Sequence, residues 1–506
     1  MNHSAMKIMF YNCLFLALPG LFVSGMNAPT EGDRVNVLLI MTDTQRKDDM
    51  GAYGNPVIRT PNLDKLAKGG VMFRQCIVQY AACMPARATI FTGRYPMAHG
   101  VWSNGVNLPE SEITIADVFL QHGYRTGGAG KFHFLSHYPY RKNVLPTMET
   151  HPGTFYGFQE FHIGEDGRSG EHGQWIEEEH PEYSGRPDNE IPVELHNSYW
   201  TASHTMDFIR DCARSGQPFF AFCSFVDPHQ GYNPPPPYGE MYREEEMPQP
   251  VRREGELDQS RFKETASQQV YRQYTNRTMY MRTQHYGEVT FIDDMVGRIV
   301  SELEDLGLRD RTLIVFVSDH GDMLGDHWLW WKGGYHWPGC TNVPLFYNWP
   351  GKIRSGKSVE GMVQQTDIMP TILELAGLEI PPGVQGISQK KVLTSDDTAT
   401  GYDWAYTEAI SSGEYHPDYF DSRGKLNIRR VEDPVNIYTI RNLEWRLSYH
   451  SGAGTGELYD LRHDPDEFRN VWDDPSYLGK RNELMEVLLN RIANTRDPLP
   501  QRVRPY

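Results

Sequence analysis

The 506-residue sequence is poor in cysteine. It has six, and no two of them form the CxxC pair that zinc ribbons and thioredoxin-like redox sites use. It also lacks a basic excess, because its net charge is -17 at pH 7, and this disfavours a general nucleic-acid binder. Beyond residue 23 no apolar run approaches the length of a membrane span, and no internal repeat is apparent. What remains is the composition of a globular protein, with 39% hydrophobic and 23% charged residues.

The first 28 residues have the pattern of a secretory signal peptide. Lys7 precedes an apolar run over residues 8–23, and small residues suited to cleavage follow that run. The alternative is a membrane anchor, but this run is short for one and is interrupted by Asn12 and Pro19. We therefore predict a secreted or periplasmic protein that has no membrane span once residues 1–28 are removed. Five cysteines would then remain, and an odd number leaves at least one thiol outside any disulfide.

Apolar runs alternate with helical patterns over most of the chain. Three runs are typical of buried parallel strands, and each is followed by Asp or His; they cover residues 35–42, 218–226 and 311–318. Amphipathic stretches between them predict helices, which indicates an α/β domain with a large mixed, mainly parallel sheet between layers of helices. We expect this domain over residues 29–385, with irregular insertions over about 139–190 and 234–256.

The chain changes character after about residue 385. Residues 436–452 and 456–467 have the pattern of antiparallel strands, and residues 476–494 that of a terminal helix. We predict a smaller α+β subdomain with an antiparallel sheet over residues 386–506.

Carboxylates follow two of the predicted strands directly. Asp43 ends the first run, and Asp319 with His320 ends the third. Carboxyl ends of parallel strands share one edge of a sheet, and carboxylates gathered there favour a divalent cation with oxygen ligands, such as calcium or magnesium. The alternative is that Asp43 caps a helix and Asp319 ends a turn.

Four basic side chains also follow apolar runs or lie among aromatic residues. Lys131 and His133 stand two apart in GGAGKFHF, so an extended strand end would direct both the same way. His229 lies in FVDPHQG and Lys332 in WLWWKGG. Each alone favours a structural or solvated role, but their common placement predicts an anion-binding pocket.

A match to the phosphate-binding pattern GxxxxGK[ST] occurs over residues 351–358. The pattern binds phosphate only where a helix begins after it. Here Pro350 precedes the match, and Gly361 would interrupt a helix after it. We predict an exposed turn there, without nucleotide binding.

The segment ACMPARATIFTGR carries the most specific signal. Arg87 stands four residues after Cys83, and a nearby cation favours the reactive thiolate. Cys83 to Arg94 matches C-x-P-[SA]-R-x-x-x-x-T-G-R and so resembles the signature of the formylglycine-dependent sulfatases of the alkaline phosphatase superfamily. Further segments similar to that family occur in family order over nearly the whole mature chain: TPNLDKLAKGGVMF, GKFHF, DPH, FIDDMVGRI, SDHGD, VPL and ELYDLRHDPDE.

This resemblance implies an alkaline-phosphatase-like fold and a covalent mechanism. In such proteins a formylglycine-generating or sulfatase-maturating enzyme oxidises the motif cysteine to an aldehyde, whose hydrate attacks sulfur and later expels sulfate. Carried over by position, Arg87 stabilises the nucleophile, and the sulfate and proton-transfer groups are Lys131, His133, His229 and Lys332. The metal, expected to be Ca²⁺ with Mg²⁺ or Mn²⁺ as alternatives, would be held by Asp43, Thr44, Cys83, Asp319 and His320.

Two departures from the family pattern keep alternatives open. Thr44, followed by Gln45, stands where many sulfatases have a second aspartate, so either residue is a candidate for completing the metal shell. Many relatives have asparagine at the position of His320, whereas a histidine there resembles the phosphonate monoester hydrolases. A phosphonate monoester or phosphodiester hydrolase is therefore the nearest alternative. An inactive carbohydrate-binding relative is the other.

A sulfated polysaccharide or oligosaccharide is the expected substrate. Candidate residues for its selection are Trp102 and Asn104, together with the segments 139–190 and 413–422.

Overall fold

The computed structural model describes most of the chain after the predicted signal peptide, which lies outside the described residues. The described ranges are 34–136, 145–149, 153–258, 260, 262–263, 266, 268–410, 415–420, 426–428 and 436–496. Among these residues, no helix combines the length and hydropathy that crossing a bilayer requires.

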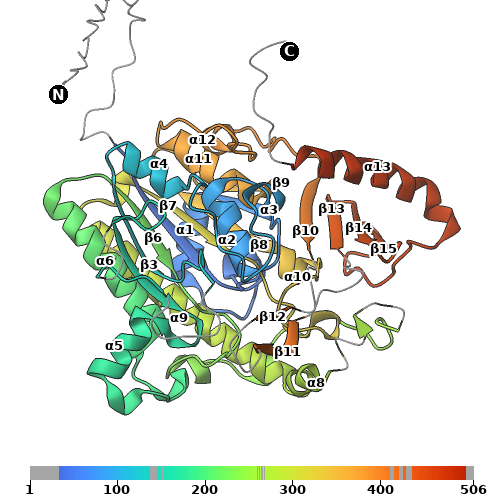
Figure 1. Ribbon diagram of the computed structural model, residues 1–506, viewed down its shortest axis with the longest axis horizontal. Coiled ribbons are helices and arrows are strands. Elements are labelled where there is room, and N and C mark those ends of the chain that lie inside the picture. Colours follow the sequence, from blue (N-terminus) through green and yellow to red (C-terminus); the bar gives the residue numbers. More distant parts are fainter. Residues whose placement is uncertain are drawn as a thin grey trace, which may run out of the picture. The chain divides into compact units, whose positions relative to one another are not determined.

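A nine-stranded sheet forms the centre of the larger part of the fold (Figure 1). Its order is β5-β4-β3-β6-β1-β7-β8-β2-β9, and only β5 and β8 pair antiparallel to their neighbours. The strands are β1 (Asn36–Thr42), β2 (Val71–Ile77), β3 (Arg125–Gly130), β4 (Glu160–Glu165), β5 (Ser169–Gly170), β6 (Phe219–Ser224), β7 (Thr312–Ser318), β8 (Asn342–Asn348) and β9 (Lys357–Gln364). The predicted mixed, mainly parallel sheet is confirmed.

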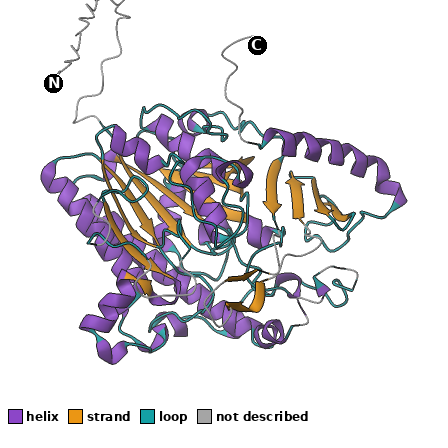
Figure 2. Cartoon of the chain, viewed as in Figure 1, coloured by secondary structure: helices purple, strands orange, loops and turns teal. Residues whose placement is uncertain are grey.

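Helices cover both faces of this sheet because its central strands are apolar on both sides (Figure 2). In β1, Leu38 and Ile40 pack with residues of α1, α6 and α9, whereas Val37 and Leu39 belong to a second core that includes α2, α4 and α11. The described helices are α1 (Pro61–Lys68), α2 (Cys83–Thr92), α3 (Pro96–His99), α4 (Ile115–Gln121), α5 (Glu171–Glu179), α6 (Asn197–Ser215), α8 (Gln269–Thr275), α9 (Thr278–Asp305), α10 (Pro338–Thr341), α11 (Ile368–Leu375), α12 (Lys390–Thr394) and α13 (Leu478–Asn494).

A separate four-stranded antiparallel sheet follows in the C-terminal part of the chain. Its order is β10-β13-β14-β15, and Leu484 and Leu488 of α13 share a buried core with it. The strands are β10 (Ala405–Ala409), β13 (Asn436–Arg441), β14 (Trp445–Ser451) and β15 (Thr455–Asp460), and β11 (Tyr415–Phe420) pairs with β12 (Leu426–Ile428) in a third sheet. The predicted α+β character of this region is confirmed, while the boundary between residues 385 and 386 stays a prediction.

One prediction about the fold is wrong. The sequence predicts an irregular insertion over residues 139–190, but β4 adds to the central sheet and α5 comes after it. β4 pairs in parallel with β3, which a segment rich in glycine, histidine and acids did not reveal. By contrast, the stretch that matches the phosphate-binding pattern forms a turn leading into β9, as predicted.

Candidate active site

Five neighbouring parallel strands end at one edge of the central sheet, and a polar side chain follows each of them. Parallel neighbours bring the residues after their carboxyl ends together, which is where ligands bind in open α/β sheets. In sheet order these residues are Asp166 after β4, Lys131 after β3, His229 after β6, Asp43 after β1, and Asp319 with His320 after β7.

Cys83 is the first residue of α2, and its side chain is buried. Ala82 before it is extended, and Pro85 falls in the first turn, where its missing N–H costs no hydrogen bond within the helix. The Asn104 side chain accepts a hydrogen bond from the backbone N–H of Met84 at 3.0 Å. The thiol therefore lies at the positive end of a helix dipole, which favours a negative charge there.

Several polar atoms surround the Cys83 sulfur. Lys332 Nζ lies 3.0 Å from Sγ, His320 Nε2 3.3 Å and Lys131 Nζ 3.9 Å. Burial raises the pKa of the Cys83 thiol, but the charges of Lys131, Lys332 and His320, together with a hydrogen bond to His133, lower it well below its usual value. The site therefore stabilises negative charge at the position of this sulfur.

Lys131 lies between two carboxylates. Its Nζ is 2.8 Å from Asp43 Oδ2 and 2.5 Å from Asp166 Oδ2, and all of its side chain is buried. Burial lowers the pKa of Lys131, but Asp166 and Asp43 raise it well above its usual value, so the side chain is a cation. His229 Nδ1 lies 3.6 Å from Asp166 Oδ1. Asp166, which the sequence analysis did not predict, thus links Lys131 and His229.

The turn that carries His133 is held by a second residue that was not predicted. Glu165 Oε1 accepts hydrogen bonds from the backbone N–H groups of Phe132 at 3.1 Å and His133 at 2.7 Å. His133 has a φ of 50°, so the expectation of an extended strand end over Lys131 and His133 is wrong. Both side chains still interact with Cys83, because the backbone turns there.

Asp43, Cys83, Asp319 and His320 form the group of donors suited to a cation. One ligand atom from each lies within 4.8 Å of all the others. Burial and the negative charge of Asp43 raise the pKa of Asp319 to about 6. Asp43 stays ionised, because the charges of Lys131 and Lys332 hold its pKa below the usual range despite burial and the neighbouring Cys83.

Arg87 lies under this group and holds both carboxylates. Nε donates to Asp319 Oδ2 at 2.8 Å, and Nη2 donates to Asp43 Oδ2 at 3.2 Å. Nη1 donates to Ser224 Oγ at 2.9 Å and to the carbonyl of Lys131. The guanidinium is completely buried, so its interactions are not weakened by solvent.

The two residues after Asp43 differ in how their side chains are used. The Thr44 hydroxyl donates to the carbonyl of Pro228 at 2.9 Å, while its backbone N–H donates to Asp319 Oδ1 at 3.2 Å. The Gln45 side chain is completely buried, and neither its amide nitrogen nor its amide oxygen has a hydrogen-bond partner among the described residues. Of these two residues, Gln45 therefore has the neutral side-chain oxygen that no other described residue engages.

One carboxylate connects the loops that carry Lys332 and His229. Asp322 Oδ1 accepts the backbone N–H groups of Leu324 and Trp331, each at 2.8 Å, and its Oδ2 accepts the Tyr232 hydroxyl at 2.8 Å. Leu324 and Trp331 have φ values of 44° and 65°, which non-glycine residues adopt only where contacts such as these impose them.

Of the residues predicted to select the substrate, one has a contact next to Cys83. Asn104 lies next to Cys83 through the helix contact described above, and Trp102 is half-buried in the same loop. Of the segment 413–422, residues 413–414 and 421–422 lie outside the described residues.

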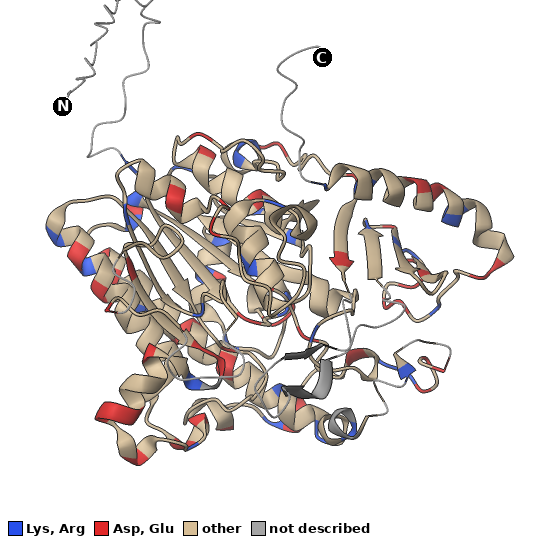
Figure 3. Ribbon diagram, viewed as in Figure 1, with Lys and Arg blue, Asp and Glu red and all other residues tan. Residues whose placement is uncertain are grey.

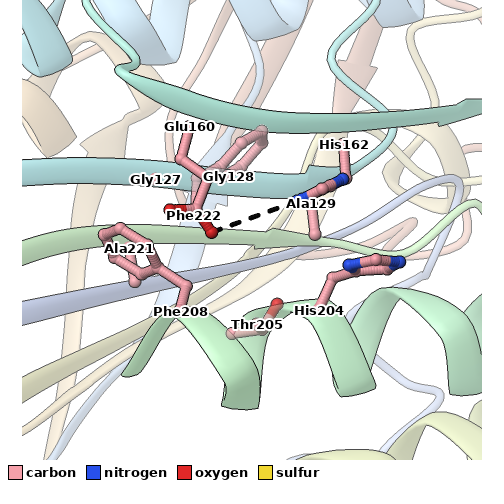
Figure 4. A pocket seen from close by; sticks show the side chains of 10 residues that line it. All are labelled: Gly127, Gly128, Ala129, Glu160, His162, His204, Thr205, Phe208, Ala221 and Phe222. Carbon is pink, nitrogen blue, oxygen red and sulfur yellow. Dashed lines mark ion pairs between the residues drawn. The ribbon is translucent and has the colours of Figure 1, made fainter. Parts of the chain in front are cut away.

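A small cavity lies between the central sheet and α6. Its volume is about 10 Å³, and Figure 4 shows His162 of β4 and His204 of α6 facing the same space. Such a volume holds at most one water molecule, so this cavity has no room for a substrate.

Comparisons with known proteins agree with the geometry. The family model "Sulfatase" matches residues 35–378, and the model "N-sulphoglucosamine sulphohydrolase, C-terminal" matches residues 325–495. An arylsulfatase of Clostridium perfringens is 29% identical over 487 residues, covering 90% of this chain and 94% of that protein. An N-acetylglucosamine-6-O-sulfatase of Bacteroides thetaiotaomicron is 25% identical over 547 residues, covering 94% and 89%. The crystal structure of a phosphonate monoester hydrolase of Agrobacterium radiobacter has a TM-score of 0.75 and 27% identity, covering 92% and 96%.

Proposed function

The chain belongs to the sulfatase family and is a sulfuric ester hydrolase, and we propose that it removes sulfate from a sulfated polysaccharide or oligosaccharide with a formylglycine made from Cys83. The observation that carries the proposal is the convergence of Lys131, Lys332 and His320 on the buried Cys83 sulfur. This arrangement suits a nucleophile that attacks an anionic ester, because cations are placed where negative charge develops.

The modified residue and its neighbours have distinct roles in this proposal. A formylglycine supplies, as its hydrate, one hydroxyl that attacks sulfur and a second that later expels sulfate and restores the aldehyde; the Cys83 sulfur stands in for these oxygens. Lys131 and Lys332 hold the sulfate oxygens by charge. His229 and His133 are the candidates for proton transfer, and His229 is assigned to the leaving alcohol because its Nδ1 lies 3.6 Å from the Asp166 carboxylate. Arg87 holds Asp43 and Asp319 in place through its ion pairs with both.

A divalent cation fits the donor set. Asp43, Asp319, His320 and residue 83 offer donors close to one another, and within the part of the chain that the structure describes the buried Gln45 amide oxygen has no hydrogen-bond partner. His320 Nδ1 lies 2.9 Å from the Gly321 carbonyl, which can only accept, so Nε2 is left to face the site. Mostly oxygen ligands favour Ca²⁺, with Mg²⁺ or Mn²⁺ as alternatives, and the ion would polarise the sulfate as a Lewis acid. Thr44 remains a proposed ligand, but its hydroxyl already donates to the carbonyl of Pro228, whereas the Gln45 amide oxygen has no hydrogen-bond partner among the described residues.

Adding Ca²⁺ to chelator-treated protein is expected to raise its melting temperature. The ion relieves the repulsion between Asp43 and Asp319, and at 100 times its dissociation constant it contributes about 2.7 kcal/mol. Asp319→Asn should lose most of this response, whereas Asp396→Asn, at an exposed position, should keep it. The measurement is a thermal melt of each variant with Ca²⁺, Mg²⁺ or Mn²⁺. Equal stabilisation of wild type and Asp319→Asn would contradict the assignment.

The substrate class and location rest on separate observations. The relative from Bacteroides thetaiotaomicron is named for a sulfated sugar, which supports a carbohydrate sulfate ester. The leader sequence supports export to the periplasm or the medium, and the signature around Cys83 supports a maturating enzyme as a partner. The net charge of -17 argues against nucleic acid as a partner.

The alternative activity can be tested with a substrate panel. His320 and the structural similarity to a phosphonate monoester hydrolase favour hydrolysis of phosphonate monoesters or phosphodiesters as the second candidate. We expect kcat/KM to be highest for a sulfated saccharide when it is compared with 4-nitrophenyl sulfate, a phenyl phosphonate ester and a phosphodiester. Higher kcat/KM for the phosphorus esters would replace the proposed function with this alternative. Absence of all turnover in protein that carries formylglycine would favour the binding-only relative.

A further inference from the structure

A second, larger cavity lies among the segments that follow β4 and β6. Its volume is about 480 Å³, within the range of small-molecule sites. We call it the side pocket. Its walls come from the segment between β4 and α6, which includes α5 (Figure 1), and from the loop after β6. The lining residues used below are Arg168, Ile176, Glu177, Arg186, Asp188 and Asn233.

Both walls of the side pocket begin at residues of the proposed catalytic site. Arg168 is two residues after Asp166, and Asn233 is four residues after His229. An extended chain spans at most about 3.6 Å per residue, which places these residues within about 7 Å and 14 Å of their catalytic neighbours along the backbone. Asp166 and His229 contact each other, so the two walls meet at the site. The chain length between these residues therefore keeps this part of the side pocket close to Asp166 and His229.

The lining suits a polyhydroxylated ring. Arg168 Nε donates to Asp188 Oδ1 at 3.0 Å, which fixes two planar polar side chains in the wall. The Asn233 backbone N–H donates to the buried Glu288 at 2.7 Å, which fixes the opposite wall. Ile176 also lines the pocket, although its side chain is almost entirely buried. Planar donors and acceptors around a partly apolar surface match vicinal hydroxyl groups and the C–H face of a sugar.

Arg186 adds a positive charge to this lining that Asp188 does not neutralise. Its guanidinium lies over the Tyr183 ring at 5.4 Å, and the side chain is exposed. Within the described part of the chain no carboxylate lies within ion-pair distance of it. Figure 3 shows acidic residues along α5, and the lining itself contains Glu177 and Asp188 besides Arg168 and Arg186. An exposed arginine at a pocket is suited to bind a carboxylate or a sulfate with two parallel hydrogen bonds.

We propose that the side pocket binds the sugar ring next to the one that carries the scissile sulfate, and that Arg186 binds an anionic group, carboxylate or sulfate, on that ring. This inference rests on the proposed sulfatase function and adds a preference for an acidic neighbouring sugar. It makes the molecule an enzyme for anionic oligosaccharides rather than for isolated sulfated monosaccharides.

The test compares matched inhibitors against a reporter substrate. The reporter is a sulfate ester from the panel that the enzyme hydrolyses, and the inhibitors are sulfated disaccharides whose neighbouring ring is glucose, glucuronate or glucose sulfate. At least one of the two acidic disaccharides should inhibit wild type more strongly than the neutral disaccharide does. Arg186→Ala should weaken that inhibition by about tenfold or more, as expected for the loss of one charge-assisted contact. Arg186→Lys should restore part of it.

The controls separate this inference from the function on which it rests. Arg214→Ala removes an exposed arginine of α6 outside the side pocket and should leave every inhibition constant unchanged. Kinetic constants for 4-nitrophenyl sulfate should be the same within twofold in wild type and Arg186→Ala. If wild type does not distinguish acidic from neutral disaccharides, or if Arg186→Ala changes all substrates equally, the inference is overturned while the sulfatase function stands. If no sulfate ester is hydrolysed, the proposed function itself fails.

Discussion

Replacing Cys83 with alanine is expected to lower sulfate-ester turnover by about 10⁴-fold or more, because loss of a covalent nucleophile leaves only the binding contribution of its surroundings. Lys131 and Lys332 keep Asp43 as a partner in the variant, and alanine is the residue that most favours a helix. The variant should therefore fold and be expressed like wild type, and the loss of activity should appear as a lower kcat.

The matched control is Cys212→Ala. Cys212 is also buried, in α6, and burial raises the pKa of its thiol to about 12, so it is an inert group. This change should cost some stability through a small cavity and leave kcat unchanged. Mass spectrometry of the tryptic peptide from Gln75 to Arg87 should find an aldehyde in place of the thiol in active wild type. An active enzyme whose peptide carries only the thiol would refute the formylglycine mechanism.

Arg87→Leu is expected to destabilise the fold by about 3–5 kcal/mol, because removing one partner of a buried ion pair leaves the other charges uncompensated. Two carboxylates, Asp43 and Asp319, lose their shared partner in a place where solvent cannot replace it. Saturating Ca²⁺ should recover part of this loss, since it restores positive charge beside the same carboxylates. Arg87→Lys keeps the charge but not the geometry, and should fall between wild type and Arg87→Leu.

Urea denaturation with and without Ca²⁺ measures these differences, and Arg354→Ala is the control. Arg354 forms an exposed pair with Asp396, and pairs of that kind contribute about 0–1 kcal/mol. If Arg87→Leu costs no more than Arg354→Ala, the assignment of Arg87 as the partner of both carboxylates is wrong.

The residues at the ends of β1 and β7 could be predicted from the sequence because their strands are continuous apolar runs. Such runs are buried on both faces, and neighbouring parallel strands bring their carboxyl ends together, so Asp43 and Asp319 had to meet. The convergence of Lys131 with these residues follows from the same rule applied to β3. The position of Cys83 came from its signature, since periodicity alone says nothing of the start of α2.

Glu165 and Asp166 were missed for a physical reason. β4 lies toward the end of the sheet and is polar enough that its pattern resembles an insertion, although the two acids at its end obey the same rule as Asp43. The turn at His133 was missed because a distant carboxylate, Glu165, imposes it. The Asp322 contacts that shape the Lys332 loop are of the same kind: their partners are set by the tertiary fold, and no local propensity encodes them.

The burial of α2 bears on how the protein is made. All ten residues of the helix are buried, and Cys83 is 1% exposed. Under the proposed formylglycine mechanism, an enzyme that oxidises Cys83 needs the surrounding peptide in its own active site, and the folded protein keeps that peptide buried. Oxidation of Cys83 would therefore have to precede folding of the nascent chain. A molecule that folds first would keep an unmodified cysteine. The yield of competent protein from a host then depends on the order of two events during biogenesis rather than on the stability of the final structure.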